Sequence, residues 1–302
     1  MSGTVLILGA TGRFGRNAAD AFETVGWQVR RFNRETDDLL VAASGADVIV
    51  NAWNPAYTDW AEQVPALHGQ VIKVAKATGA TVIVPGNVYV YGPDNGTVWS
   101  ADTPHKAQNP LGRVRIEMEA AYRQSGVRTI ILRAGDFIDT EASGNWFDEI
   151  LTKSIGKGRF TYPGNPDIPH AWAFLPDVTR AAVQLAEMRD RLNTYEDIAF
   201  PGYTLTGRQM AEMIGRATAQ KIRLRKMNWL PLHLAAPFWK MGRCLLEMRY
   251  LWNTPHQLAG LRFDALLPGF TTTPVVSAMA AALGSGANHQ EPPISSSIQT
   301  SR

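Results

Sequence analysis

Short apolar runs alternate with amphipathic runs over the first 135 residues of the chain. Each apolar run is bounded by Gly, Asp, Asn or Pro, which is typical of strands buried in a parallel sheet. The runs between them have the spacing of helices with one buried face. Strands are expected at Val5–Leu8, Gln28–Phe32, Val48–Ala52, Val82–Val84 and Thr129–Leu132, and helices at Gly15–Val25, Thr58–Thr78 and Arg113–Ser125. The alternation predicts an α/β fold with a Rossmann-type, doubly wound parallel sheet.

The pattern changes after Arg133 to helices mixed with short strands and aromatic loops. A helix is expected from Pro176 to Met188, and a strand at Asp197–Phe200 precedes a capping box that begins at Thr206. We expect a dinucleotide-binding domain in residues 1–164 and a smaller, substrate-side lobe in residues 165–283. The Gly-, Ser- and Pro-rich segment 284–302 is typical of a disordered tail.

A glycine-rich turn follows the first expected strand and opens the first helix. Gly9, Gly12 and Gly15 allow a tight turn, a close approach of the backbone to a pyrophosphate, and close packing of helix on strand. The helix N-terminus then offers unpaired N–H groups to phosphates. This position in the chain predicts a dinucleotide site, with Thr11, Arg13 and Phe14 in the same turn as further contacts.

The chain resembles the short-chain dehydrogenase/reductase superfamily in its extended and atypical branches, which are similar to NAD-dependent epimerases and dehydratases. The resemblance rests on the GxxGxxG turn and on the segments at 87–93, 132–137 and 175–181. It implies a nicotinamide cofactor and a small-molecule substrate.

The end of the second strand selects the cofactor in this fold, because a carboxylate there binds a ribose hydroxyl and an arginine accommodates a 2′-phosphate. Asn33 stands where NAD-selective relatives carry Asp, and Arg34 stands where NADP-selective relatives carry Arg. We therefore expect NADP(H), with NAD(H) left open. Three further residues expected at the cofactor lie at the end of the third expected strand or directly after it: Asn51, Ala52 and Trp53.

The resemblance also implies a catalytic tyrosine, a lysine four residues later and an upstream serine. The chain has Leu111, Arg115 and Asn87 at these three places. Leucine cannot transfer a proton, whereas arginine stays cationic and can still bind a ribose. Asn87 can donate a hydrogen bond to an oxygen. Tyr89 lies just after the fourth expected strand, near the expected nicotinamide position, and could replace the missing tyrosine. Asn87, Tyr89 and Arg115 are the expected catalytic residues.

Aromatic and titratable residues gather in the loops that should follow the strands. They predict a pocket for a small apolar or aromatic substrate, although some could be packing residues, and the histidine could be a loop residue bonded to backbone. The expected substrate contacts are Tyr57, Asp136, Trp146, His170 and Trp172.

Composition narrows the partners. The net charge is +3 and the basic residues are scattered, which does not favour nucleic-acid binding. A single cysteine, Cys244, excludes an intrachain disulfide and a cysteine metal cluster, and no other residues suggest a metal site. The sequence indicates no signal peptide or transmembrane segment, so we expect a cytoplasmic protein. Relatives often dimerise, which leaves a homodimer open.

Three functions stay open on the sequence. The first is an atypical NADP(H)-dependent oxidoreductase without the usual tyrosine and lysine. The second is a non-catalytic dinucleotide sensor, regulatory or assembly protein. The third, a membrane-surface helper, depends on the Trp229–Trp252 region. The sequence favours a hairpin packed on the protein for the apolar stretch of this region, Trp229 to Trp239.

Overall fold

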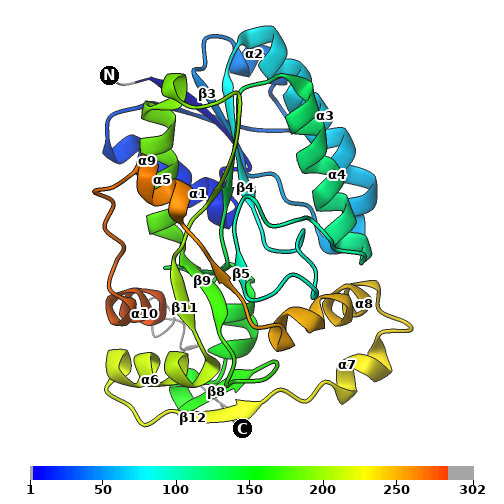
Figure 1. Cartoon of the computed structure of the whole chain (residues 1–302), viewed down its shortest axis with the longest axis vertical. Coiled ribbons are helices and arrows are strands. Elements are labelled where there is room, and N and C mark those ends of the chain that lie inside the picture. The colour runs from blue at the N-terminus through cyan, green and yellow to red at the C-terminus, as the bar shows by residue number, and fades with distance from the viewer. Residues whose placement is uncertain (1–2, 285–302) are drawn as a thin grey trace, which may run out of the picture.

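A six-stranded parallel sheet forms the centre of the protein (Figure 1). The computed structural model describes residues 3–284 of the chain. Across the sheet the strands are β10 (Tyr195–Ala199), β6 (Thr129–Arg133), β4 (Thr81–Gly86), β3 (Val48–Asn51), β1 (Thr4–Leu8) and β2 (Gln28–Phe32). All neighbours run parallel, so their carboxyl ends share one edge. The predicted Rossmann-type sheet is confirmed.

Helices cover both faces of this sheet because its buried strands alternate their side chains between two apolar clusters. In β1, Val5 and Ile7 enter one cluster, whereas Leu6 and Leu8 enter the other. The first cluster is covered by α1 (Arg13–Thr24), α5 (Leu175–Glu187) and α9 (Leu261–Leu266); the second is covered by α2 (Leu39–Ala43), α3 (Trp60–Thr78) and α4 (Pro110–Ser125). Figure 1 shows α1 and α5 on one side of the sheet and α3 and α4 on the other.

A second group of elements lies beyond the carboxyl edge of the sheet (Figure 1). Its strands form three small sheets: β7 (Asp136–Ile138) with β9 (His170–Phe174) and β11 (Tyr203–Leu205); β8 (Arg159–Tyr162) with β12 (Arg223–Lys226); and β5 (Val98–Trp99) with β13 (Gln257–Leu258). Its helices are α6 (Gly207–Thr218), α7 (Leu230–Ala235), α8 (Lys240–Glu247) and α10 (Val275–Gly284). Trp172, Met210 and Trp252 belong to its own apolar core.

The remaining helical segments are short. Phe147–Leu151 forms a turn of π-helix. Single turns of 3₁₀-helix occur at Tyr57–Asp59, Ile155–Lys157 and Arg189–Arg191, and a longer 3₁₀ segment spans Met248–Asn253. The first of these 3₁₀ turns leads into α3, where the sequence predicts one continuous helix from Thr58.

The predicted boundary between the two lobes at residue 164 stays a prediction. After residue 164 the chain contributes elements to both the main sheet and the second group. Beyond that position β10 joins the main sheet and α5 packs against α1. The expected capping box is present, since the Thr206 side chain accepts from the Gln209 N–H and the Gln209 side chain accepts from the Thr206 N–H. Apart from Gly284, the expected tail lies outside the described residues.

A buried ion cluster ties the end of the sheet to α4. Arg133 at the end of β6 is fully buried, and its Nη2 lies 2.7 Å from Glu119 Oε2 and 2.6 Å from Asp197 Oδ2. Its Nη1 donates to the carbonyl oxygen of Asn87 at 2.5 Å. Burial alone would lower the pKa of Arg133, but the two carboxylates hold it well above its ordinary value. The cluster joins β6, β10, α4 and the segment that follows β4.

His105 lies beside the same carboxylates, 3.9 Å from Glu119 and 4.0 Å from Asp197, in a grouping that resembles a metal site. Arg133 already supplies a positive charge to both carboxylates. Burial also lowers the pKa of His105, which favours a neutral imidazole. The grouping is therefore explained by the ion cluster.

Within residues 3–284, every helix is either too short or too polar to span a bilayer.

Replacing Arg133 by Met should destabilise the protein by about 3–5 kcal/mol, because Glu119 and Asp197 would be left buried without a counter-charge. Burial raises the pKa of Glu119, but Arg133 more than offsets this, and the net pKa lies below its ordinary value of 4.5. The carboxylate therefore adds stability above pH 4.5, and this contribution is lost as the pH falls through the lower folded-state pKa. Urea unfolding at several pH values measures both effects.

The matched control is Arg216→Met, which breaks an exposed ion pair with Glu212 of 2.6 Å. It should change stability little, because exposed pairs contribute little. The difference in the free energy of unfolding between wild type and Arg133→Met should become smaller at acid pH, because protonated carboxyl groups need no counter-charge. Equal losses in the two variants would contradict the role given to the buried cluster.

Candidate functional site

A cavity of about 790 Å³ lies at the carboxyl edge of the sheet. It begins where β1 and β3 end, at the point where the strand order reverses, which is where open α/β sheets bind ligands. Its lining includes residues from the glycine turn, from the segments after β3, β4 and β6, and from α3, α4 and the α7–α8 region. One space therefore joins the glycine turn to the second lobe.

The glycine turn has the geometry that a bound phosphate requires. Gly9 adopts a φ of +73°, and a Cβ on Gly15 would lie 2.1 Å from the Gly9 carbonyl oxygen. Gly12 is the N-cap of α1, and no side chain among residues 3–284 caps this helix end. Gly12, Arg13 and Phe14 line the cavity, while Thr11 is exposed on the turn. The N–H groups at the start of α1 are free for an anion.

The arginines near the end of β2 differ in their partners. Arg30 donates to the carbonyl oxygens of Ala42 and Ser44, and Arg31 forms an ion pair with Glu23. Among the described residues, Arg34 has a contact with the Trp53 ring at 6.0 Å and no hydrogen bond or ion pair. Of these three arginines it is the one whose donors are available to a ligand.

Asn33 forms hydrogen bonds within its own loop. Its Oδ1 accepts from the Glu35 N–H at 3.0 Å, and its backbone N–H donates to Asp37 Oδ2 at 2.8 Å. Both Asn33 and Arg34 are exposed and lie outside the cavity lining. The nearest part of the cavity wall along the sheet edge is formed by Ala52 and Trp53.

Asn51 belongs to a buried polar triad, and two of its members, Asn51 and His68, line the cavity. Its Nδ2 lies 3.1 Å from His68 Nδ1 and 3.1 Å from the Tyr122 hydroxyl, and its Oδ1 accepts from the Trp53 N–H. Burial and the nearby Arg115 lower the pKa of His68 to about 3. A neutral histidine thus helps to fix the chain after β3, where the cavity begins.

Arg115 presents a buried positive charge to the cavity. The side chain is 5% exposed, its Nη2 donates to the Pro85 carbonyl oxygen at 2.6 Å, and its guanidinium lies 5.7 Å from the Trp60 ring. Burial lowers its pKa, but an arginine stays cationic at neutral pH. Within residues 3–284, its Nε has no hydrogen-bond partner and no carboxylate forms an ion pair with it. Because Arg115 lines the cavity, its positive charge favours a polar or anionic ligand there.

Tyr89 and Tyr57 bring two phenols together on the cavity wall. Their hydroxyl oxygens are 2.6 Å apart. Burial raises the pKa of Tyr89 well above its ordinary value and also raises that of Tyr57. Asn87 lines the cavity too, and its Oδ1 accepts from the Tyr89 N–H, which fixes the turn after β4. Both phenols therefore stay protonated at neutral pH.

Leu111 is buried at the start of α4, outside the cavity lining. Its N–H donates to Glu247 Oε1 at 2.7 Å. Arg115, one turn later on the same helix, is in the lining. The correspondence of these two positions to the tyrosine and lysine of the superfamily stays a prediction from the sequence.

The expected substrate residues separate into two layers. Tyr57, Asp136 and Trp146 line the cavity. His170 and Trp172 on β9 are 2% and 1% exposed and lie outside that lining. His170 begins a strand rather than a loop, and its Nε2 lies 2.7 Å from Asp136 Oδ2. Its ring also stacks on Trp252, so it positions Asp136 from behind.

Several lining residues were missed from the sequence. Trp60 and His68 lie on α3, whose buried face looked like ordinary core packing. Others come from the α7–α8 region, whose apolar residues gave no sign of which face would meet the cavity: Met227, Leu232, Trp239, Met241 and Leu245. The Trp229–Trp239 stretch forms α7 and the turn before α8, not the packed hairpin that the sequence predicts; Trp229 and Ala236 are buried, whereas Leu234 and Phe238 are exposed.

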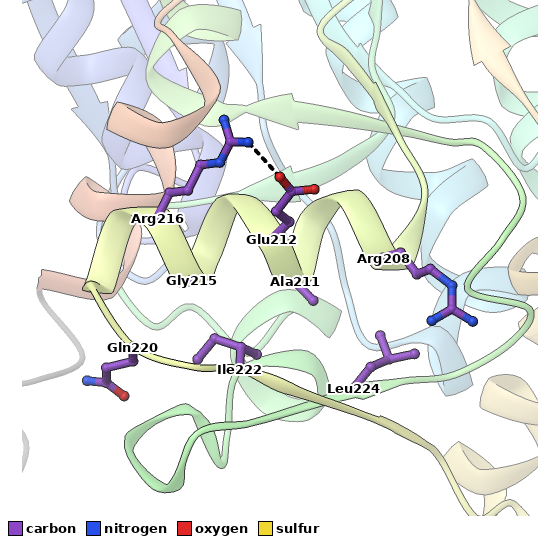
Figure 2. Close-up of a pocket in the computed structure, with 8 residues that line it drawn as sticks. All are labelled: Arg208, Ala211, Glu212, Gly215, Arg216, Gln220, Ile222 and Leu224. Carbon is purple, nitrogen blue, oxygen red and sulfur yellow. Dashed lines mark hydrogen bonds and ion pairs between the residues drawn. The ribbon is translucent and has the colours of Figure 1, made fainter.

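A second depression of about 620 Å³ lies between α6 and β12 (Figure 2). Figure 2 shows Arg216 and Glu212 paired with each other on α6 and Ile222 and Leu224 on the strand side. Its charged side chains are exposed and it lies on the second lobe, remote from the glycine turn in the fold. It lacks the buried polar groups of the main cavity.

Solved structures similar to this chain share its fold over almost its whole length. Human epimerase family protein SDR39U1 (isoform 2) with NADPH is 17% identical, with a TM-score of 0.72, and the match covers 93% of this chain and 99% of that chain. RMD from Pseudomonas aeruginosa complexed with NADPH is 12% identical, with a TM-score of 0.70 and coverage of 94% and 99%.

MoeE5 in complex with UDP-glucose and NAD is 14% identical, with a TM-score of 0.71 and coverage of 94% of this chain and 99% of that chain. At these identities the likeness concerns the fold. No match to the chain was found among curated proteins.

The profile of the RmlD substrate binding domain family matches residues 3–157, just over half of the chain. The matched segment contains the glycine turn, the Asn87–Tyr89 turn and α4. The chain belongs to the RmlD substrate binding domain family, within the extended and atypical short-chain dehydrogenase/reductase superfamily.

Proposed function

We propose that the protein is an NADP(H)-dependent oxidoreductase that acts on a small apolar or aromatic carbonyl compound. The observation that carries the proposal is the single cavity that joins an uncapped helix N-terminus to Arg115, Tyr89 and Asp136. A dinucleotide and a small substrate could share this space, because ligand pockets of about 300–1,000 Å³ are usual.

The residues present fit a dinucleotide. The close packing of α1 on the glycine turn at Gly15 and the N–H groups at the start of α1 suit a pyrophosphate, and the guanidinium of Arg115, which lines the cavity, suits a ribose oxygen. Arg34 suits a 2′-phosphate, because its donors have no hydrogen-bond partner among the described residues. The similar structures hold NAD or NADPH, which supports a nicotinamide cofactor, and the choice of NADP(H) rests on Arg34.

The chain's own residues can supply the other half of the reaction. NADPH, when bound, supplies a hydride to a carbonyl carbon. The carbonyl oxygen takes its proton from the Tyr89 hydroxyl. Tyr57, hydrogen-bonded to Tyr89 and less buried, replaces that proton and takes one in turn from water. Arg115 holds the positive charge near the developing negative oxygen, and the Asn87 amide can donate a further hydrogen bond.

The apolar part of the cavity defines the substrate class. Its lining includes the apolar side chains of Trp146, Leu232, Trp239 and Leu245, and two carboxylates, Asp136 and Glu149. Such a wall favours a flat or apolar compound over a charged one. Oxidation of NADPH should be followed with aromatic and aliphatic aldehydes, ketones and enones. Saturable NADPH binding without turnover of any of them would contradict the proposed reaction.

Arg34→Ala should weaken NADPH binding by about tenfold to a hundredfold, since a charge-assisted contact to phosphate contributes roughly 1.5–3 kcal/mol. NADH binding should change little, because NADH has no 2′-phosphate. Fluorescence titration with each nucleotide measures the difference. The matched control is Arg31→Ala, which removes an arginine already paired with Glu23 and should leave both affinities unchanged. An equal loss of affinity for NADPH and for NADH in Arg34→Ala would contradict the assignment of NADP(H) as the cofactor.

Tyr89→Phe should lower kcat by a factor of about 10²–10⁴, the usual effect of losing a positioned acid, while NADPH binding stays within a factor of about two. Tyr91→Phe is the control, because the Tyr91 hydroxyl donates to the Ser100 carbonyl oxygen outside the cavity lining. Steady-state kinetics with the best substrate of the carbonyl panel gives both values. If Tyr89→Phe turned over like the control, another group, such as Asp136, would have to supply the proton.

A further inference from the structure

The α7–α8 region exposes apolar side chains that nothing in the described chain covers. Of the nine large apolar side chains that are exposed among the described residues, four fall between positions 230 and 239. Their exposed fractions are 60% for Leu230, 68% for Leu234, 94% for Phe238 and 47% for Trp239. Such clustering marks an interaction site, whereas single exposed apolar residues are ordinary.

The same region is strongly basic. Residues 221–246 contain six of the 30 Lys and Arg residues and none of the 27 Asp and Glu residues. The rest of the chain therefore has more acidic than basic residues and is net negative. The basic residues of this segment are Lys221, Arg223, Arg225, Lys226, Lys240 and Arg243. All six are exposed. Along the chain, these basic residues flank the exposed apolar side chains of residues 230–239 on both sides.

The region sits at the edge of the molecule, with α7 projecting beside α8 (Figure 1). Its inner side chains, among them Leu232 and Leu245, line the main cavity. Trp239 belongs to both faces, because it lines the cavity and is also half-exposed. The outer apolar surface is thus continuous with the cavity wall.

We propose that residues 225–243 dock on an anionic lipid surface, with Leu230, Leu234, Phe238 and Trp239 inserted among the acyl chains near the headgroups. Leu, Phe and Trp beside Lys and Arg form the combination that binds at such an interface. A second copy of the chain fits poorly, because a symmetric contact would bring two basic segments together. Docking on lipid would also place the cavity wall at Trp239 next to the acyl chains of the membrane. The binding itself does not depend on the cofactor.

Co-sedimentation of the full chain with vesicles tests this surface. The protein should bind equimolar phosphatidylcholine–phosphatidylglycerol vesicles, and binding should weaken with added salt or with phosphatidylcholine alone. Phe238→Ser should lower the partition coefficient about tenfold or more, because a large apolar side chain would no longer be inserted. Lys240→Gln should lower it about fivefold through the lost charge.

Two matched controls use residues elsewhere on the surface. Leu261→Ser changes an 81% exposed leucine on α9, and Lys153→Gln changes a lysine whose side chain is 70% exposed. Both should bind vesicles like wild type, and thermal unfolding should show that all four variants are folded. Failure of wild type to bind, or equal losses in the controls, would overturn the proposal. It would also be overturned if sedimentation velocity showed a dimer that Phe238→Ser dissociates while vesicle binding stays unchanged.

Discussion

The buried guanidinium of Arg133 is the constraint on which the site depends. A fully buried cation must be paired, and Arg133 meets this need with Glu119 on α4, Asp197 on β10 and the Asn87 carbonyl oxygen. These contacts fix the end of the sheet, the helix that carries Arg115 and the turn that carries Tyr89. The same charges that cost energy to bury therefore set the positions of the residues proposed to act on the substrate.

The site combines a typical binding half with an altered proton-transfer half. The glycine turn, the uncapped start of α1 and the buried Arg115 have the features that a dinucleotide needs. Leu111, in contrast, is packed away from the cavity, while the Tyr57 and Tyr89 hydroxyls meet on its wall. Moving the phenol from a helix to the turn after β4 would keep an acid near the substrate on a different element, which is the central proposal for this protein.

Local patterns predicted most of the fold, and long-range contacts explain what they missed. The strands and the glycine turn follow from alternation of buried side chains and from steric demands that are written in neighbouring residues. The sequence predicts His170 and Trp172 as substrate contacts on a loop. Pairing of β9 with β7 and β11 instead buries both side chains behind Asp136. The role of Trp239 depends on how the α7–α8 region lies over the cavity, and the role of Arg133 depends on partners 14 and 64 residues away. No short sequence window contains that information.

A crystal structure of the complex with NADPH tests the central proposal most directly. We expect the pyrophosphate to lie against Gly12 and the start of α1, with the nicotinamide between Arg115 and the Tyr89 side of the cavity. A substrate oxygen beside the reactive carbon should then fall within about 3.2 Å of the Tyr89 hydroxyl or one water away from it. A nicotinamide bound with Tyr89 out of that reach, or a dinucleotide bound outside this cavity, would contradict the proposal.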